Sequence, residues 1–157
     1  MIYQDRVYGQ IKIEKPLILE LINHPLMQRL KGVNQSGYYE PFLNKESYSR
    51  FEHSVGVYIL LKKFDAPFRE QVAGLIHDFS HSVFSHCIDY VLNKGAEEKQ
   101  NYQDNIFANY ILSSDLPIIF KKYHLDIKFL LDEKNFPLKE KDLPDLCADR
   151  IDYTLRN

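Results

Sequence analysis

The spacing of apolar residues most constrains what this chain can fold into, because it follows the period of a helix almost throughout. Residues 25–36 illustrate this, with Leu26, Leu30 and Val33 on one predicted helical face. Alternation typical of strands is partial and confined to residues 5–14, which predicts a short hairpin or extended arm. The expected fold class is therefore all-α, with that arm at the N-terminus. The predicted helices cover residues 17–24, 25–36, 51–63, 65–78, 84–93, 102–112, 115–123, 126–132 and 142–156.

Length and composition are those of one ordinary globular domain, and we interpret residues 1–157 as a single domain. The net charge of −2 gives no general attraction to nucleic acid or to an anionic membrane. We find no signal peptide at the start and no apolar run long enough to span a membrane. Cys87 and Cys147 lie far apart and form no C-x-x-C pair, which excludes zinc-finger and thioredoxin-type sites. Two reduced cysteines predict a cytoplasmic protein.

Four of the six histidines fall within residues 53–86, and this density of imidazole beside carboxylates favours metal binding. Spacing first selects His77 and His81, which lie one helical turn apart. The alternative is a pair of histidines at a helix end that bond to the backbone or to water. A short turn at residues 63–67 would fold the predicted helix of His53 back against the helix that ends at His77. These side chains are therefore expected to lie near one another.

The predicted helix 142–156 has two different faces. Asp149, Asp152, Tyr153 and Arg156 follow helical spacing and form a polar stripe. Spacing leaves two interpretations open, since the stripe either supplies groups to a site or is a solvated face linked by salt bridges. The other side is expected to be apolar and to carry Leu143, Leu146, Cys147, Ile151 and Leu155.

Three ordered blocks of sequence together resemble the HD-domain phosphohydrolases. They are RFEHSVGV at 50–57, AGLIHDFSHSVFSH at 73–86 and ADRIDY at 148–153. The resemblance is closest to the branch that hydrolyses deoxynucleoside triphosphates to deoxynucleoside and triphosphate. Two further blocks, VYGQIKI at 7–13 and HPLMQRLKGVNQSGYY at 24–39, also have counterparts there. The resemblance thus extends over nearly the whole chain and implies the helical bundle of an HD domain.

The resemblance implies one divalent metal ion with four ligands, namely His53, His77, Asp78 and Asp149. It puts Asp78 in the place for which spacing had favoured His81. Adjacent residues point in different directions on a helix, so His77 and Asp78 can share an ion only near a helix end. Two neutral imidazoles and two carboxylates balance the charge of the cation and leave positions open for water and a phosphate oxygen. The expected ion is Mn²⁺, Fe²⁺, Mg²⁺, Ni²⁺, Co²⁺ or Zn²⁺ at a site without thiolate.

The resemblance also implies residues that act on a substrate. His81 and His86 would contact phosphate or transfer protons, and Asp89 would orient one of them. The implied substrate-binding residues are Gln35 and Tyr153 at a sugar, and Arg50 and Arg150 at phosphate oxygens. Simpler roles remain open for these four residues: surface charge for the arginines, a helix-end polar group for the glutamine and core packing for the tyrosine.

Three departures from the family pattern bear on function. Ser80 and Ser82-Val83 stand where the family has Gly and Gly-Pro, which predicts a different local turn. Gln103-Asp104 stands where triphosphohydrolases carry a His-Glu pair, and glutamine does not transfer protons near pH 7. Family members also continue well past the last metal ligand, whereas this sequence ends soon after it.

The sequence thus predicts a metal-dependent phosphohydrolase that acts on nucleotides, most of all on deoxynucleoside triphosphates. A phosphomonoesterase or nucleotidase acting on another small phosphate ester is the second interpretation. A non-catalytic module that binds metal and nucleotide is the contrasting one, and Gln103 favours it. A nuclease is disfavoured by the near-neutral charge and by the lack of a basic stripe. The expected partners are a nucleotide or other phosphate-bearing small molecule and further copies of the chain, without a membrane.

Overall fold

The structure is a computed structural model, and it describes residues 1–37, 46–84 and 102–157. Within these ranges a two-stranded hairpin precedes a series of helices, so the expected all-α fold with an N-terminal hairpin is confirmed. No helix in the described ranges is both long and apolar enough to cross a bilayer. The elements are β1 (Ile2–Asp5), β2 (Gly9–Lys12), α1 (Pro16–Asn23), α2 (Pro25–Arg29), the 3-10 turn η1 (Leu30–Gly32), α3 (Arg50–Lys63), α4 (Phe68–Ile76), α6 (Tyr102–Leu112), α7 (Leu116–Lys122), α8 (Ile127–Leu131), the 3-10 turn η2 (Glu133–Asn135) and α9 (Ala148–Arg156).

The N-terminal hairpin is held by its own turn. β1 and β2 pair antiparallel, with Asp5 opposite Gly9. Asp5 Oδ1 accepts hydrogen bonds from the backbone N–H groups of Val7 and Tyr8 at 2.8 and 2.9 Å, which stabilises the turn. Gly9 has a φ of +75°, which glycine adopts without strain. The other carboxylate oxygen of Asp5 takes no part in this turn.

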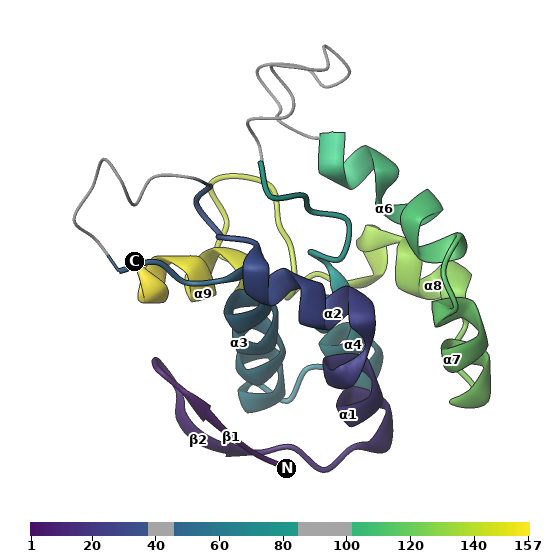
Figure 1. Ribbon diagram of the computed structural model, residues 1–157, viewed down its shortest axis with the longest axis horizontal. Coiled ribbons are helices and arrows are strands. Elements are labelled where there is room, and N and C mark those ends of the chain that lie inside the picture. The colour runs from purple at the N-terminus through teal and green to yellow at the C-terminus, as the bar shows by residue number, and fades with distance from the viewer. Residues whose placement is uncertain (38–45, 85–101) are drawn as a thin grey trace.

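α3 and α4 form the centre of the domain and lie side by side in Figure 1. Ser49 begins α3 with a capping box, in which its Oγ accepts from the Glu52 N–H at 3.2 Å and Glu52 Oε2 accepts from the Ser49 N–H at 2.9 Å. The expected short turn after α3 leads back into α4. Gly74 of α4 faces Leu61 of α3, and a side chain at position 74 would collide with Leu61. The two helices therefore pack closely.

Apolar side chains from α1, α2, α3, α4 and α7 pack into one large cluster, which we call the apolar core. α1 buries one face completely against this core, and Figure 1 shows α1 in front of α4. Burial of such side chains is the main favourable contribution to folding. The largest contributors include Leu17, Ile18, Leu21, Met27, Leu30, Tyr58, Ile59, Phe79 and Phe120.

The last predicted helix is shorter than expected. α9 begins at Ala148 and not at residue 142, because Pro144 lacks an N–H donor and disfavours a helical conformation of the residue before it. The helices expected at 25–36 and 65–78 are also shorter, and the helix expected at 84–93 lies almost wholly outside the described residues. The apolar side expected for the helix 142–156 is not buried as a whole, since Leu143, Leu146 and Leu155 are 80%, 73% and 55% exposed.

α9 turns its charged side chains inward, against α3. Asp152 is fully buried and Arg156 is 8% exposed, so a solvated face does not describe them either. Gly56 of α3 makes this contact possible, because a side chain there would collide with both Asp152 and Arg156. We call the charged or titratable groups between α3, the end of α4 and α9 the polar seam; it comprises His53, His77, Asp78, Asp149, Asp152 and Arg156.

Candidate metal centre

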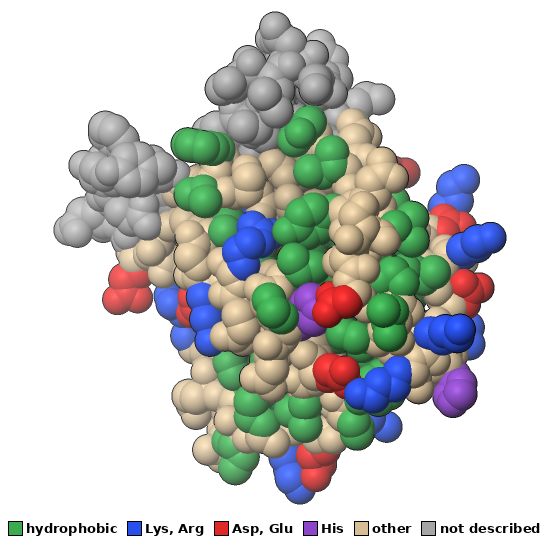
Figure 2. All heavy atoms as spheres, turned by 45° about the vertical axis from the view of Figure 1, so that its right-hand side comes forward, with side chains coloured by type: hydrophobic (Ala, Val, Ile, Leu, Met, Phe, Trp, Pro, Cys, Tyr) green, Lys and Arg blue, Asp and Glu red, His purple; other side chains and the backbone are tan. Residues whose placement is uncertain are grey.

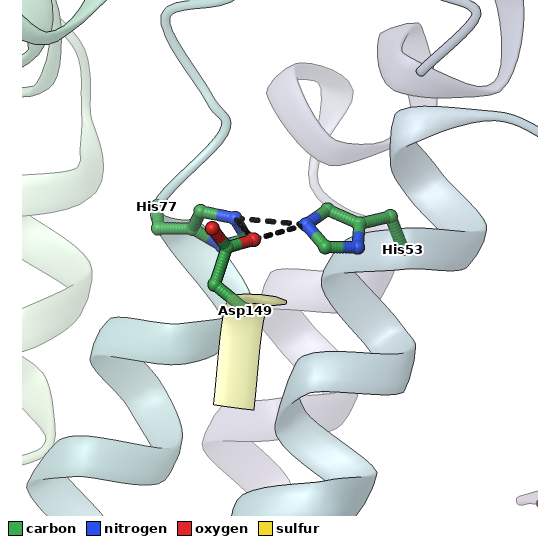
Figure 3. A group of neighbouring side chains, drawn as sticks. All are labelled: His53, His77 and Asp149. Carbon is green, nitrogen blue, oxygen red and sulfur yellow. Dashed lines mark hydrogen bonds and ion pairs between the residues drawn. The ribbon is translucent and has the colours of Figure 1, made fainter. Parts of the chain in front are cut away.

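Three side chains from three helices converge at one point of the polar seam. His53 lies near the start of α3, His77 directly follows α4 and Asp149 lies in the first turn of α9. Figure 3 shows the two imidazoles and the carboxylate pointing toward one another. One potential ligand atom from each lies within 4.8 Å of the others. The fold thus joins groups that are far apart in the sequence.

Two of the three separations match those of ligands that share a cation, and the third is a hydrogen bond that a cation would replace. Asp149 Oδ1 is 2.6 Å from His53 Nε2 and 3.4 Å from His77 Nε2, and the two Nε2 atoms are 3.2 Å apart. Ligand atoms about 2.1 Å from one ion lie about 3.0 Å apart in octahedral and about 3.4 Å apart in tetrahedral coordination. Mixed imidazole and carboxylate ligands suit a divalent transition metal or Mg²⁺. The residues present therefore fit the expected ion.

Asp78 lies beside this group but is not one of the three that converge within 4.8 Å. Its Oδ1 is 3.5 Å from His77 Nε2 and 3.3 Å from His81 Nε2. Its Oδ2 accepts a hydrogen bond from Arg50 Nη1 at 2.8 Å, and both side chains are buried. α4 ends just before His77, so His77 and Asp78 lie in a turn at a helix end, where two adjacent residues can face one ion.

Hydrogen bonds at the far side of each ring set the tautomers of the two histidines. Asp152 Oδ2 is 2.8 Å from His53 Nδ1, which places a proton on Nδ1 and would leave Nε2 to bind a cation once that cation replaces the proton that Nε2 shares with Asp149 Oδ1. His77 Nδ1 donates in the same way to the backbone oxygen of Gly74 at 2.7 Å. Both rings thus present Nε2 as the metal ligand requires. Sequence reasoning did not assign this role to Asp152, although its position in the polar stripe was a signal.

Asp152 is itself held from both ends of the chain. Arg156 donates from Nε to Asp152 Oδ2 at 2.7 Å and from Nη2 to Asp5 Oδ2 at 2.8 Å. The Tyr8 hydroxyl donates to Asp152 Oδ1 at 2.8 Å. A continuous buried network therefore connects the hairpin, through Asp152, to His53.

The charges of these side chains by themselves favour protonated imidazoles and ionised carboxylates. Burial alone would lower the pKa of His53, but hydrogen bonds to two carboxylates outweigh it and raise the pKa to about 9. The pKa of His77 is also raised against its burial, by the charge of Asp78 and by a hydrogen bond to Asp149. Burial opposes ionisation of Asp78, yet the Arg50 guanidinium and the nearby histidines hold its pKa below the ordinary value. A divalent cation would replace the protons held between these groups.

A cavity of about 250 Å³ opens beside these groups and is lined in part by His77, Asp78 and Asp149. Four residues with predicted roles also line it: Gln35, Arg50, His81 and Tyr153. Gln35 Oε1 is buried and accepts no hydrogen bond from the described residues, so it is available to a ligand. Three further lining residues come from the stretch between α8 and α9, which sequence reasoning did not assign to a site: Glu133, Lys139 and Glu140.

Comparison with known proteins identifies the family. Residues 50–157 match the HD domain family. This chain belongs to that family. It is 43% identical over 155 residues to the uncharacterized protein YdhJ of Bacillus subtilis, and the aligned region covers 98% of this chain and 46% of that protein. It is 38% identical over 157 residues to the metal-dependent phosphohydrolase cns2 of Cordyceps militaris, covering 100% of this chain and 45% of that protein.

Two more distant similarities extend the family assignment. The chain is 30% identical over 158 residues to the deoxynucleoside triphosphate triphosphohydrolase SAMHD1 of Mus musculus, covering 84% of this chain and 24% of that protein. Its fold matches the crystal structure of a hypothetical protein from Aquifex aeolicus with a TM-score of 0.75 and 27% identity, over 99% of this chain and 45% of that one. The chain thus spans less than half the length of the relatives it matches.

In this HD domain, Arg150 does not line the cavity itself, although its Nη2 is 3.4 Å from Oε1 of the lining residue Glu140. Its guanidinium donates to the backbone oxygens of Asp145 and, at 2.9 Å, of Lys141. It therefore ties the loop before α9 to α9 itself, and its phosphate role stays a prediction. His86 and Asp89 lie outside the described residues, so their predicted catalytic roles stay predictions as well.

The turn that follows His77 and Asp78 is supported from two sides. Arg29 donates to the backbone oxygens of His81 and Phe79 at 2.7 and 2.6 Å, a role that sequence reasoning missed. Gln103 is buried and its Nε2 donates to Ser82 Oγ at 3.2 Å, so it packs behind this turn and does not line the cavity. The residues that replace family glycines here, Ser80 and Ser82-Val83, have no positive φ and so adopt their turn without that strain.

Proposed function

We propose that this HD domain is the catalytic domain of a metal-dependent phosphohydrolase that acts on nucleotides, with deoxynucleoside triphosphates as its leading substrates. The observation that carries the proposal is the convergence of His53, His77 and Asp149, with Asp78 beside them, at a polar cavity. We propose these four residues as the ligands of one divalent cation. The cavity supplies room for a phosphoryl group directly beside them.

The chemistry divides between the ion and the chain. A bound cation would supply Lewis-acid polarisation of a phosphoryl oxygen and a lowered pKa for coordinated water. Arg50 would orient phosphate oxygens, because its guanidinium lines the cavity and is fixed by Asp78. His81 Nε2, 3.3 Å from Asp78 Oδ1, would hold a proton there and pass it to the leaving oxygen. Gln35 and Tyr153 would contact the sugar from the same cavity.

The choice of substrate rests on the relatives. The Mus musculus relative is named a deoxynucleoside triphosphate triphosphohydrolase and the Cordyceps militaris relative a metal-dependent phosphohydrolase. Gln103 stands where the former branch is expected to have a histidine, so proton transfer has to come from another residue, which we propose is His81. We also propose that the enzyme acts in the cytoplasm and as a homo-oligomer. Cell fractionation and light scattering test those two points.

Turnover tests the proposal directly. The full-length protein is loaded with Mn²⁺ and incubated with deoxynucleoside triphosphates, ribonucleoside triphosphates and nucleoside monophosphates, and the products are separated by ion-exchange chromatography. We expect deoxynucleoside and triphosphate. The variant Asp149→Ala should be inactive, whereas Asp142→Ala, an exposed aspartate of the loop before α9, should retain activity. Tight nucleotide binding without turnover of any substrate would instead support the non-catalytic module.

Two other activities give different products. Release of orthophosphate from monophosphates alone would identify a phosphomonoesterase. A nuclease would need a continuous basic surface for the phosphate backbone. On the face shown in Figure 2, the described Lys and Arg side chains are interspersed with Asp and Glu. Binding to single-stranded nucleic acid at several salt concentrations tests this alternative, and we expect none at physiological salt.

A further inference from the structure

Lys139 is a buried lysine at the edge of the metal cavity. Its side chain is 7% exposed and lines the cavity with His77, Asp78 and Asp149. A lysine is almost never buried to this extent unless it is paired. Within the described part of the chain, its ammonium donates a hydrogen bond to Glu133 Oε1 at 2.9 Å.

The pairing with Glu133 does not account for the burial of Lys139. The Glu133 side chain is 66% exposed, and an ion pair with so exposed a partner is screened by water and contributes little. An ammonium group also has three protons to donate. A buried cation with one weakly held partner is therefore poised to exchange that partner for a stronger anion.

The backbone of Lys139 is fixed relative to the metal centre. Its N–H donates to Glu70 Oε1 at 2.9 Å, and Glu70 is buried on α4. Its carbonyl oxygen accepts from the Asp149 N–H at 3.2 Å. The residue that carries this ammonium is thus hydrogen-bonded to a proposed metal ligand and anchored to the helix that precedes His77. These hydrogen bonds fix the position of Lys139 relative to the proposed metal ligands.

The charges of the cavity indicate which ligand would displace Glu133. Arg50 and Lys139 are the Lys and Arg side chains among the described lining residues, and Arg50 is already paired with Asp78. Glu140 also lines the cavity, and burial together with the charge of Asp149 raises its pKa, so added negative charge is costly near it. A phosphate chain placed on the metal would need a cation beyond the ion itself. Lys139 is the cation with an exchangeable partner.

We propose that Lys139 forms a second phosphate subsite, which binds a phosphate group of the substrate next to the one at the metal, and that Glu133 occupies the ammonium until substrate arrives. This rests on the proposed function of the same cavity. It assigns the substrate to compounds with at least two linked phosphates, because the metal with Arg50 and the ammonium of Lys139 offer two separate anion positions. A lysine suits this role as a point charge for phosphate oxygens.

Inorganic pyrophosphate is the probe that tests this subsite. Its affinity is measured by titration calorimetry on the full-length, Mn²⁺-loaded protein, with thermal melts and metal content recorded for each variant. We expect Lys139→Met to weaken binding about ten- to hundredfold, the loss of a charged hydrogen bond. The matched control, Lys134→Met, removes an exposed lysine of the same stretch and should leave affinity within about twofold of wild type. Glu133→Gln should tighten binding, because it removes the competitor.

The opposite signs expected for the two variants separate a subsite from a structural ion pair. A structural pair would lower the melting temperature equally in Lys139→Met and Glu133→Gln and leave pyrophosphate affinity unchanged, which overturns the inference. Should Lys139→Met not fold, Glu133→Gln decides alone, since unchanged or weaker binding overturns the subsite. Nucleotide turnover is measured on the same samples. Pyrophosphate binding that depends on Lys139, without nucleotide turnover, overturns the enzyme proposal and supports the subsite. Nucleotide turnover together with an unchanged pyrophosphate affinity in Lys139→Met supports the enzyme proposal and overturns the subsite.

Discussion

α1 and α9 are both short helices packed against the centre of the domain, yet they bury opposite kinds of surface. α1 places Leu17, Ile18 and Leu21 in the apolar core. α9 places Asp152 and Arg156 in the polar seam and leaves Leu155 facing solvent. The first contact is non-directional and gains free energy with area. The second is directional, and its desolvation cost is offset only while every charge keeps its partner.

The apolar core and the polar seam therefore contribute differently to stability and to metal binding. The apolar core supplies most of the stability and tolerates substitutions that conserve volume. The polar seam contributes less net stability but fixes the ring of His53 through Asp152 and the position of Asp78 through Arg50. Damage to the core should therefore lower stability alone, whereas damage to the seam should change metal binding.

The largest effect is expected at Asp78. Asp78→Ala should abolish metal retention and activity, because it removes a proposed ligand and leaves Arg50 buried without its carboxylate, which also costs about 3–5 kcal/mol of unfolding free energy. Asp78→Asn keeps the shape and separates the loss of charge from the loss of packing. Elemental analysis after dialysis measures the metal. If Asp78→Ala keeps its metal while His81→Ala loses it, then His81 is the ligand and the assignment of Asp78 is wrong.

A second pair of variants sharpens the contrast between the two regions. Asp152→Asn should weaken metal affinity about 10- to 100-fold, because it removes the charge that orients His53. Leu21→Ala in the apolar core should cost about 2–5 kcal/mol of stability and leave metal affinity unchanged. Metal titration and urea unfolding of both variants give the two quantities. Equal metal affinity in the two variants would remove the distinction between core and seam.

The seam should also respond to pH in a way that the apolar core cannot. The folded, metal-free protein holds the pKa of His53 at about 9, above the ordinary value of 6.5. The stability from its protonated form is therefore complete below pH 6.5 and is lost as the pH rises from 6.5 through 9. We expect the melting temperature to fall by roughly 10 °C over this window, and metal to reduce the fall because it binds neutral imidazole. His53→Asn should flatten the profile, whereas His124→Asn, at an exposed position, should not affect it.

The smallest effect is expected on the outer face of α9. Leu155→Ala removes an exposed leucine and should change the unfolding free energy by no more than about 0.5 kcal/mol. Arg156→Met, at the next position, removes a partner of Asp152 and Asp5 and should cost several times more. Chemical denaturation of the two variants measures the difference. A larger loss for Leu155→Ala would mean that this face is covered by something that stabilises it.

Much of the fold could be predicted because it depends on local periodicity. The helices around residues 51–63, 102–112 and 115–123 lie close to their expected positions, and the hairpin is present. The polar stripe of α9 was visible too, but not its direction. Apolar residues such as Leu155 usually turn inward, but hydrogen bonds to Asp5 and His53, which are remote in sequence, hold Arg156 and Asp152 inward instead.

The site could be predicted only in part, for a similar reason. The short turn between their helices predicted that His53 and His77 lie near one another, but local spacing favoured His81 over Asp78. The resemblance to HD-domain proteins supplied Asp78 and Asp149. Lys139 and Glu133 gave no such signal. They belong to an irregular stretch between helices, where no period shows which side chains face inward. The place of Lys139 at the cavity depends on hydrogen bonds from the backbone N–H groups of Leu138 and Lys139 to Glu70.

The network that joins the hairpin to the metal centre has a consequence for the order of folding. Asp5 pairs with a residue 151 positions away, and His53 with one 96 positions away. Contacts this remote in sequence carry a large loop-closure entropy and form slowly. A nascent chain therefore carries His53 and His77 long before it has Asp149, and the three-ligand centre cannot close until α9 has left the ribosome and docked on α3. Metal capture should thus be a late event in biogenesis, coupled to the meeting of the hairpin with α9.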